Sequence, residues 1–414
     1  MRWALVWSAV SGLAGCYGGG AFHCETNDQC SGAGMQGVCQ PDSFCSFPDA
    51  VCPTGQRYGT SSGPSSGQCV GGGPMDAPME PLSTEPGIDA QECFGDKTAV
   101  CIHPPPAQPL ALPAVIHTDT DCMMTVPQTG GTDLCVFYGA TITTPDDVRA
   151  TGNRPLVLVA SDSISVDHTI DVSSQQGGTP GAAANASQCN APTAAKNGGG
   201  GGGGGAGGSF VGKGGNGGQG DQNGGKNNGG NAGDASPPAL IRGGCPGGVG
   251  GDGTGNGGAF GNGGGAVYLI ALNQITVAGN IFASGAAGAG GGVEAGAGGA
   301  GSGGMVGFDA TTITDTGVVA ANGGGGGGGG STSMGPGAAG GEGTTTNYNQ
   351  RAPAGAGTGT NKGDGGAGTD DATQNADNGH NADGGAGAGG GGIGIVWKHG
   401  AFTGAKVSPT PTDR

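Results

Sequence analysis

The chain has 414 residues, of which 104 are glycine and 25 are proline, so these two types make up about 31% of it. This glycine content excludes a helical bundle, because glycine costs about 1 kcal/mol per helical position relative to alanine. Lys and Arg number 14 against 31 Asp and Glu, a net charge of −17, so no basic stripe is present to bind nucleic acid. Glycine does not recur strictly at every third position, which excludes collagen.

Residues 1–15 form the first predicted element, an export signal. Arg2 is the one early charge, and the segment from Trp3 to Ala14 is almost wholly apolar or small. This segment is too short to cross a hydrocarbon layer about 30 Å thick. It ends in Leu13-Ala14-Gly15-Cys16, which resembles the lipobox of bacterial lipoproteins.

The resemblance implies that the chain is cleaved before Cys16 and that acyl chains such as palmitate anchor this residue in a membrane. Tyr17 stands where an aspartate would favour inner-membrane retention, so the resemblance implies the outer membrane. The alternative is an ordinary secretory signal followed by a chance cysteine. The cysteine count agrees with acylation, because 12 of the 13 cysteines remain for disulfides once Cys16 carries lipid.

Residues 16–69 are expected to form a small module stabilised by disulfides. Apolar residues are few here, so a hydrophobic core alone could not offset the chain entropy, whereas three disulfides contribute roughly 2–4 kcal/mol each. The six cysteines are Cys24, Cys30, Cys39, Cys45, Cys52 and Cys69. A zinc module is the competing hypothesis, but it favours close C-x2-C pairs, which this segment lacks. The sequence does not select one of the 15 pairings of six cysteines.

The run Phe44-Cys45-Ser46-Phe47-Pro48-Asp49, with Cys52-Pro53 and Cys69-Val70, resembles the Cys-rich modules of myxobacterial-type surface lipoproteins.

Two further cysteine sets follow a predicted linker at residues 70–91. Beyond the linker we expect Cys93, Cys101, Cys122 and Cys135 to pair among themselves. We also expect Cys189 to pair with Cys245.

A strand pattern recurs between residues 92 and 407, and it predicts a repeat. Two copies share identical offsets, and a third has one residue fewer; a degenerate fourth follows. The first contains Leu156, Leu158, Ala160, Ile164, His168, Ile170 and Val172; the second Val267, Leu269, Ala271, Ile275, Gly279, Ile281 and Ala283; the third Val306, Phe308, Ala310, Ile313, Gly317, Val319 and Ala321; the fourth Ile393, Ile395, Trp397, Ala401, Ala405 and Val407.

Each copy alternates apolar side chains at period two, which indicates short strands joined by corners. One copy cannot bury its apolar face, but copies stacked in parallel can. The predicted fold class is therefore mainly β, a parallel β-helix or β-solenoid over residues 92–407 with a tail at 408–414. The runs 156–160 and 267–271 are apolar throughout, so these strands should be covered on both faces.

Long Gly-rich excursions separate the copies, at residues 177–264, 285–304 and 323–392. Such sequence buries little apolar surface, which is typical of disorder. The alternative is a set of polyglycine II-like strands packed closely because the Cβ is missing. The composition does not choose between these alternatives. It is similar to that of Gly-rich bacterial envelope proteins.

The high glycine content also produces chance matches to Gly-rich binding motifs, and such a match indicates a site only in the right structural context. Residues Gly207 to Gly214 mimic a P-loop, but Gly214 stands where Ser or Thr should hold Mg²⁺. The segments 247–255 and 365–373 fit the register of calcium-binding nonapeptides, but neither occurs in tandem. Loose calcium binding is the one cofactor hypothesis that we retain, and no other cofactor is expected. Its candidate ligands are Asp364, Asp370, Asp371, Asp377 and Asp383.

No catalytic constellation is visible, so we do not expect an enzyme. Asp167, His168 and Asp171 form the most reactive-looking cluster, but neighbouring strand residues point to opposite faces. An outward polar corner explains them better. Parallel β-helices do include polysaccharide-degrading enzymes, which is an argument from fold alone, and the acids of the repeat are scattered singly.

These observations predict an outer-membrane lipoprotein, exposed at the cell surface, with a structural or adhesive role. Cys16 is the predicted site of lipid attachment, and no catalytic, cofactor or metal residue is predicted. The expected partners are the membrane and an envelope or extracellular polysaccharide. The alternatives are a polysaccharide-binding or polysaccharide-degrading β-helix and an unfolded Gly-rich stalk.

Overall fold

The computed structural model describes residues 23–32, 35–49, 52, 54–62, 65–70, 92–359 and 361–414. The chain divides into two compact units, Met1–Pro86 and Gly87–Arg414. Strands dominate both units, and the helical element of the described residues is one 3-10 turn, η1 (Asn27–Gln29). The expectation of a mainly β protein is confirmed. The predicted signal, Cys16 and most of the predicted linker lie outside the described residues.

Disulfides replace an apolar core in the first unit. Its strands are β1 (Ser31–Gly32), β2 (Met35–Gln36), β3 (Val38–Cys39), β4 (Cys45–Pro48) and β5 (Gln56–Tyr58). β1 pairs with β2, and β3, β4 and β5 form an antiparallel sheet in that order. The disulfides are Cys24–Cys39, Cys30–Cys45 and Cys52–Cys69. The buried cluster consists of cysteines with Phe47 against them, as expected for a module poor in apolar residues.

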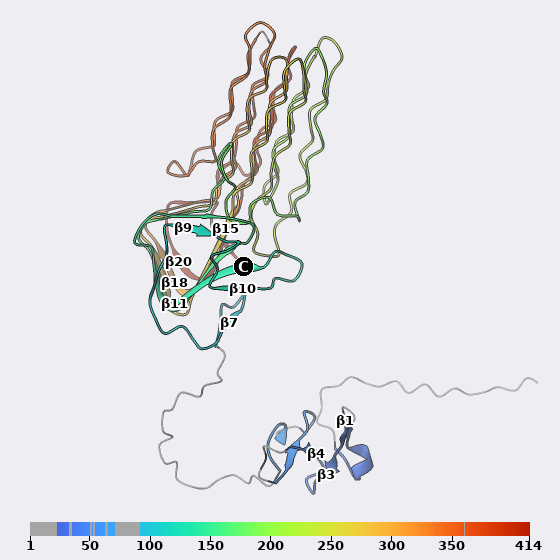
Figure 1. Ribbon diagram of the computed structural model, residues 1–414, viewed down its shortest axis with the longest axis vertical. Coiled ribbons are helices and arrows are strands. Elements are labelled where there is room, and N and C mark those ends of the chain that lie inside the picture. The colour runs from blue at the N-terminus through green and yellow to red at the C-terminus, as the bar shows by residue number, and fades with distance from the viewer. Residues whose placement is uncertain are drawn as a thin grey trace, which may run out of the picture. The chain divides into compact units, whose positions relative to one another are not determined.

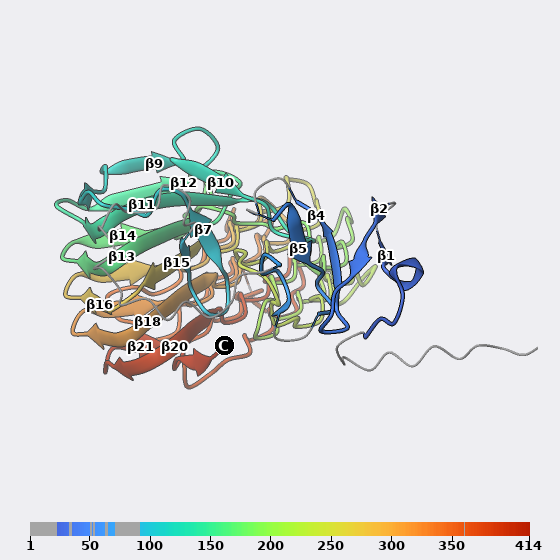
Figure 2. The same cartoon turned by 90° about the horizontal axis from the view of Figure 1, so that it is seen from below.

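Two mainly parallel sheets organise the second unit (Figures 1 and 2). The larger sheet has the order β10-β11-β13-β15-β18-β20-β22, with β8 and β16 beside it, and the smaller has the order β21-β19-β17-β14-β12-β9. A separate antiparallel hairpin, β6–β7, precedes them. The strands are β6 (Glu92–Phe94), β7 (Val100–Ile102), β8 (Leu110–Ala111), β9 (Val115–His117), β10 (Met124–Val126), β11 (Leu134–Thr143), β12 (Val148–Thr151), β13 (Leu156–Val166), β14 (Thr169–Asp171), β15 (Ala266–Ala271), β16 (Gln274–Val277), β17 (Asn280–Phe282), β18 (Met305–Asp315), β19 (Val318–Ala320), β20 (Ile395–Thr403), β21 (Val407–Ser408) and β22 (Thr412–Asp413).

The first three predicted copies pair in the predicted register. Leu156 pairs with Val267, and Val267 pairs with Val306. In the smaller sheet, strands β14, β17 and β19 align in the same way. An earlier copy, formed by β11 and β12, pairs with β13 and β14, and the sequence pattern did not separate it from the surrounding residues.

The fourth copy keeps the predicted register in the smaller sheet, where Val319 pairs with Val407, but its predicted register in the larger sheet is wrong. Val306 pairs with Val396 and not with Ile393. A shift by an odd number of residues exchanges the two faces of a strand. Val396 therefore packs in the inner core, while Ile395 and Trp397 pack on the opposite face. The run around Gly394 is apolar at nearly every position, so its periodicity did not define the inward face.

Both faces of the larger sheet are buried, as predicted. One face joins the smaller sheet in the inner core, which includes Leu158 and Phe308. The opposite face carries Val159 and Tyr268 in a second cluster. This second face is covered partly by a hairpin and partly by apolar side chains from a Gly-rich excursion. The residues that cover it include Phe94, Val100 and Ile102 of the β6–β7 hairpin and Phe210 and Ile241 of the first excursion.

The Gly-rich segments leave the sheets as long narrow loops (Figure 1), and their backbones bond to one another at intervals of three residues. Gly202, Gly205 and Gly208 donate to the carbonyl oxygens of residues 294, 297 and 300 at 2.8–2.9 Å. The same segment accepts from Gly248 and Gly251 on another side. A Cβ added at Gly205 would overlap the carbonyl oxygen of Gly248. Only glycine permits this approach of three backbones.

Three disulfides stabilise the second unit. They are Cys93–Cys101, Cys122–Cys135 and Cys189–Cys245. The predicted pairing within each set is confirmed. Cys93–Cys101 closes the β6–β7 hairpin, and Cys122–Cys135 joins the segment before β10 to β11.

Candidate functional site

The predicted lipid-attachment residue, Cys16, lies outside the described residues and stays a prediction. Among the described residues, no helix has the length and apolar character needed to cross a membrane.

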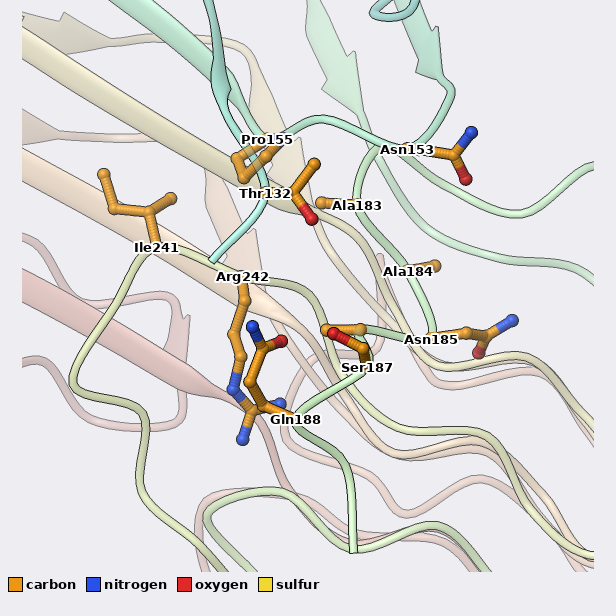
Figure 3. A pocket seen from close by; sticks show the side chains of 11 residues that line it. Thr132, Asn153, Pro155, Ala183, Ala184, Asn185, Ser187, Gln188, Ile241 and Arg242 are labelled. Atoms are coloured by element: carbon orange, nitrogen blue, oxygen red, sulfur yellow. The ribbon is translucent and has the colours of Figure 1, made fainter. Parts of the chain in front are cut away.

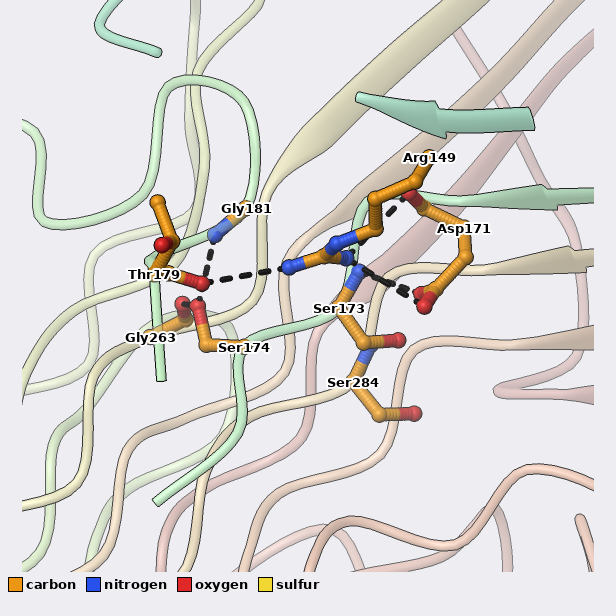
Figure 4. Close-up of polar contacts among 8 residues, drawn as sticks. All are labelled: Arg149, Asp171, Ser173, Ser174, Thr179, Gly181, Gly263 and Ser284. Atoms are coloured by element: carbon orange, nitrogen blue, oxygen red, sulfur yellow. Dashed lines mark hydrogen bonds and ion pairs between the residues drawn. The ribbon is translucent and has the colours of Figure 1, made fainter. Parts of the chain in front are cut away.

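The structure separates the side chains of the Asp167, His168 and Asp171 cluster. Asp167 and His168 are exposed at the corner between β13 and β14, where their N–H groups donate to Thr144 Oγ1. Asp171 forms an ion pair with Arg149 of the neighbouring β12 at 3.2 Å (Figure 4). Its Oδ1 also accepts from the Ser173 N–H at 2.8 Å. Asp171 therefore stabilises a turn beside the stacked strands, and the cluster does not converge on one point.

The P-loop mimic forms no phosphate cradle. The N–H groups of Gly207 and Gly208 donate to the carbonyl oxygens of Gly215 and Ala300, at 2.8 and 2.9 Å. Lys213 Nζ forms an ion pair with Asp234 at 3.3 Å. These backbone donors are already used inside the packed segments, so a phosphate group would find none pointing toward it.

The five aspartates of the calcium hypothesis do not gather. Asp364 accepts from the Gly357 N–H at 2.8 Å, and Asp377 forms an ion pair with Arg351 at 3.0 Å. Asp370 accepts from the Thr373 N–H at 2.9 Å, and Asp371 accepts from the Thr410 N–H at 2.6 Å. Each carboxylate fixes a separate backbone turn or side chain. The carboxylates therefore lack the shared oxygen cage that Ca²⁺ prefers.

The one close group of three metal-ligating atoms among the described residues consists of the sulfurs of Cys24, Cys30 and Cys45, which lie within 4.8 Å of one another. All three belong to disulfides. A disulfide sulfur offers no thiolate to a metal. The zinc hypothesis for the first unit is therefore wrong for the oxidised chain.

A cluster that the sequence did not suggest lies on the second face of the larger sheet. His399 Nδ1 lies 3.1 Å from Asp309 Oδ1, and His399 Nε2 lies 3.3 Å from Asp96 Oδ2. Asp309 and His399 pair in the neighbouring strands β18 and β20, and Asp96 comes from the β6–β7 hairpin. These residues line a pocket of about 270 Å³ together with Phe94, Leu272 and Thr311.

The two carboxylates have different environments. The Asp309 side chain is only 6% exposed, and its Oδ2 accepts from the N–H groups of Asp96 and Lys97 at 2.9 and 3.4 Å. Asp96 is 72% exposed. Asp309 therefore fixes one edge of the imidazole, while the other edge faces a carboxylate free to move in solvent. An imidazole oriented in this way is suited to proton transfer or to holding a polar group of a ligand.

A second polar network joins the tips of the Gly-rich loops. Glu294 accepts hydrogen bonds from Thr254 and Thr332, which lie on two other tips. Asp383 accepts from Asn223 and Asn361 in the same manner. The Thr254 and then the Thr332 hydroxyl lower the pKa of the Glu294 carboxyl below its usual 4.5. Each carboxylate thus links three loops, and the loop tips are cross-linked through their side chains.

Comparison of the chain with protein-family models, with curated proteins and with solved structures finds no match.

Proposed function

We propose that the chain is an outer-membrane lipoprotein, anchored through Cys16, whose Gly-rich unit has a structural or adhesive role at the cell surface. In this proposal the stacked strands form a β-solenoid, and the Gly-rich segments form polyglycine II-like strands that extend from it. The parallel pairing of β11, β13, β15, β18 and β20 supports the first part. The three-residue interval of the backbone hydrogen bonds supports the second, because a polyglycine II strand has three residues per turn.

The observation that carries the adhesive role is the cross-linked set of tips. Long loops that each sample many conformations would lose conformational entropy when they bind a surface. Here Glu294 and Asp383 each link three loops, so the tip residues are ordered before any contact. The amide, hydroxyl and carboxylate groups at these tips suit a hydroxyl-rich surface such as an envelope or extracellular polysaccharide.

Membrane attachment is tested by the Cys16→Ser variant in the native host. We expect this variant to leave the membrane fraction and to lose incorporation of labelled palmitate. Cys189→Ser serves as the matched cysteine control, because it removes a disulfide partner and leaves the lipobox intact. Continued membrane association of Cys16→Ser would contradict the anchor.

Surface display and adhesion are tested on intact cells. Protease treatment should release fragments of the Gly-rich unit, and cells carrying Glu294→Ala with Asp383→Ala should adhere less to polysaccharide-coated surfaces. Asp167→Ala removes an exposed carboxylate at a corner of the stacked strands and should leave adhesion unchanged. Equal adhesion of the two variants would contradict a role for the tips.

A second candidate function, polysaccharide binding or degradation, is favoured by the Asp96, His399 and Asp309 pocket. Two carboxylates flank an imidazole there, and Asp309 is held rigidly by backbone N–H groups. Depolymerisation of acidic or neutral polysaccharides by the purified chain would support this function, provided that His399→Gln abolishes it. Absence of turnover across both polysaccharide classes would contradict the degrading role.

A further inference from the structure

Arg242 is a buried cation without a counter-ion. It is 7% exposed, and none of the ion pairs among the described residues involves it. By contrast, Arg57, Arg149 and Arg351 each pair with an aspartate. Burying a charge without a partner is costly. Burial also lowers the pKa of Arg242 to about 10, so the group keeps its charge at neutral pH.

The protein uses only part of the hydrogen-bonding capacity of this guanidinium. Nη1 donates to the Gly243 carbonyl oxygen at 3.3 Å and lies 3.6 and 3.8 Å from the Cys245 and Cys189 sulfurs. Nη2 donates to the Ser236 carbonyl oxygen at 3.2 Å. A guanidinium has five N–H donors, and among the described residues neither the Nε hydrogen nor one of the two Nη2 hydrogens has an acceptor. The Nε hydrogen is parallel to the Nη2 hydrogen on the same edge of a guanidinium, and this edge can bind an oxyanion through two oxygens.

The guanidinium is held in place by its surroundings. The Phe210 ring lies 4.5 Å from its carbon atom and covers one face. The Cys189–Cys245 disulfide joins the two chain segments that surround it. A cation fixed by an aromatic ring, a disulfide and two carbonyl oxygens loses little further freedom on binding a ligand.

A pocket of about 160 Å³ adjoins Arg242 (Figure 3). Its other polar side chains include Thr132, Ser187 and Gln188, and no Asp or Glu lines it. Arg242, Ser187 and Gln188 all line this pocket and are labelled in Figure 3. At about 30 Å³ per water molecule, the volume suits one small group of several heavy atoms.

We propose that this pocket binds a small oxyanion group, a carboxylate or a sulfate or phosphate ester, through the Nε–Nη2 edge of Arg242. The hydroxyl and amide groups of Thr132, Ser187 and Gln188 supply further hydrogen bonds. The anion compensates the buried charge, which the protein itself leaves unpaired in a chain with a net charge of −17. The proposal does not depend on membrane anchoring or adhesion.

The test is calorimetric titration of the oxidised full-length mature chain with sodium sulfate, sodium phosphate, sodium acetate and sodium glucuronate, at matched ionic strength in sodium chloride. We expect saturable binding of at least one of these anions. Sulfate or phosphate alone would indicate a tetrahedral ester, and acetate and glucuronate a carboxylate. Arg242→Lys should weaken binding by about tenfold or more, because lysine keeps the charge and loses the paired donors. Arg242→Met should abolish it.

Arg154→Met is the matched control, because Arg154 donates to the carbonyl oxygens of Thr118 and Asp119 and does not line the pocket. This variant should bind as the wild type does. Absence of saturable binding to all four anions would overturn the proposal. Equal binding by the wild type and Arg242→Lys would also overturn it, since the paired donors would then have no role. The lysine comparison stands even if Arg242→Met fails to fold.

Discussion

Asp315 occupies a position in the inner core that two neighbouring strands fill with valine. It pairs with Val277, which pairs with Val166, and it is only 5% exposed. Its Oδ1 accepts from the Gly317 N–H at 3.0 Å, and its Oδ2 has no hydrogen-bond partner among the described residues. Burial raises the pKa of this carboxyl from 3.8 to about 6, against the opposing effects of the Gly317 N–H and of Lys406.

This pKa predicts the direction of a pH effect on stability. A carboxyl with a higher pKa in the folded state binds more protons there, so the free energy of unfolding falls as the pH rises from about 4 to about 6. The difference between the folded-state pKa of about 6 and the ordinary value of 3.8 corresponds to at most about 3 kcal/mol. Asp315→Asn should remove this pH dependence, and Asp315→Val should continue the valine column and raise the stability at neutral pH.

The assay is denaturant unfolding of the oxidised chain at several pH values, followed by circular dichroism. Other carboxylates contribute with the opposite sign: a hydrogen bond from the His117 N–H lowers the pKa of Asp121, and one from the Thr169 N–H lowers that of Asp147. They are common to the wild type and the variants. The difference between wild type and Asp315→Asn therefore isolates Asp315. Parallel pH profiles for these two proteins would refute the reasoning.

Three further predictions concern the packing of the second unit. Gly205→Ala should lower the free energy of unfolding by about 1–3 kcal/mol, because its Cβ would overlap the Gly248 carbonyl oxygen. The control in the same denaturant assay is Gly199→Ala, whose Cβ would enter open space. Equal losses of stability in the two variants would contradict the close packing. Replacing both Cys189 and Cys245 by alanine opens a closure of 56 residues and should cost about 4 kcal/mol, measured by calorimetry as a lower Tm; an unchanged Tm would count against a stabilising disulfide. Asp309→Ala removes the acceptor of the Asp96 and Lys97 N–H groups, so it should speed hydrogen exchange of the β6–β7 hairpin and cost about 1–3 kcal/mol. Replacing the exposed Asp133 by alanine should leave hydrogen exchange of this hairpin unchanged. Exchange as slow in Asp309→Ala as in the wild type would show that other contacts hold the hairpin.

The sequence predicted the parallel strands well where apolar alternation was clear. Leu156, Val267 and Val306 are each followed by apolar residues at intervals of two, and this period defines the inward face. The register of the fourth copy failed in the larger sheet because the residues from Ile393 to Trp397 are apolar on both faces apart from Gly394. The β-solenoid itself and the lipid anchor stay predictions.

The pocket residues were harder to predict because they come together from distant parts of the chain. Asp309 had a usable signal, since it stands in the register position that Val159 and Ile270 fill in earlier copies. His399 was hidden by the wrong register of the fourth copy. Arg242 lies in a Gly-rich excursion without periodicity, so nothing in the sequence placed it beside Phe210 and a disulfide.

The close packing of glycine backbones has a thermal consequence. Unfolding an ordinary domain exposes apolar side chains, which raises its heat capacity, whereas exposed polar backbone lowers it. The Gly-rich segments bury mainly peptide groups, so their unfolding should add little to the heat capacity change or even reduce it. The stability curve of this unit should therefore be unusually flat with temperature, and the loops should stay ordered in the cold, where proteins that depend on apolar burial weaken.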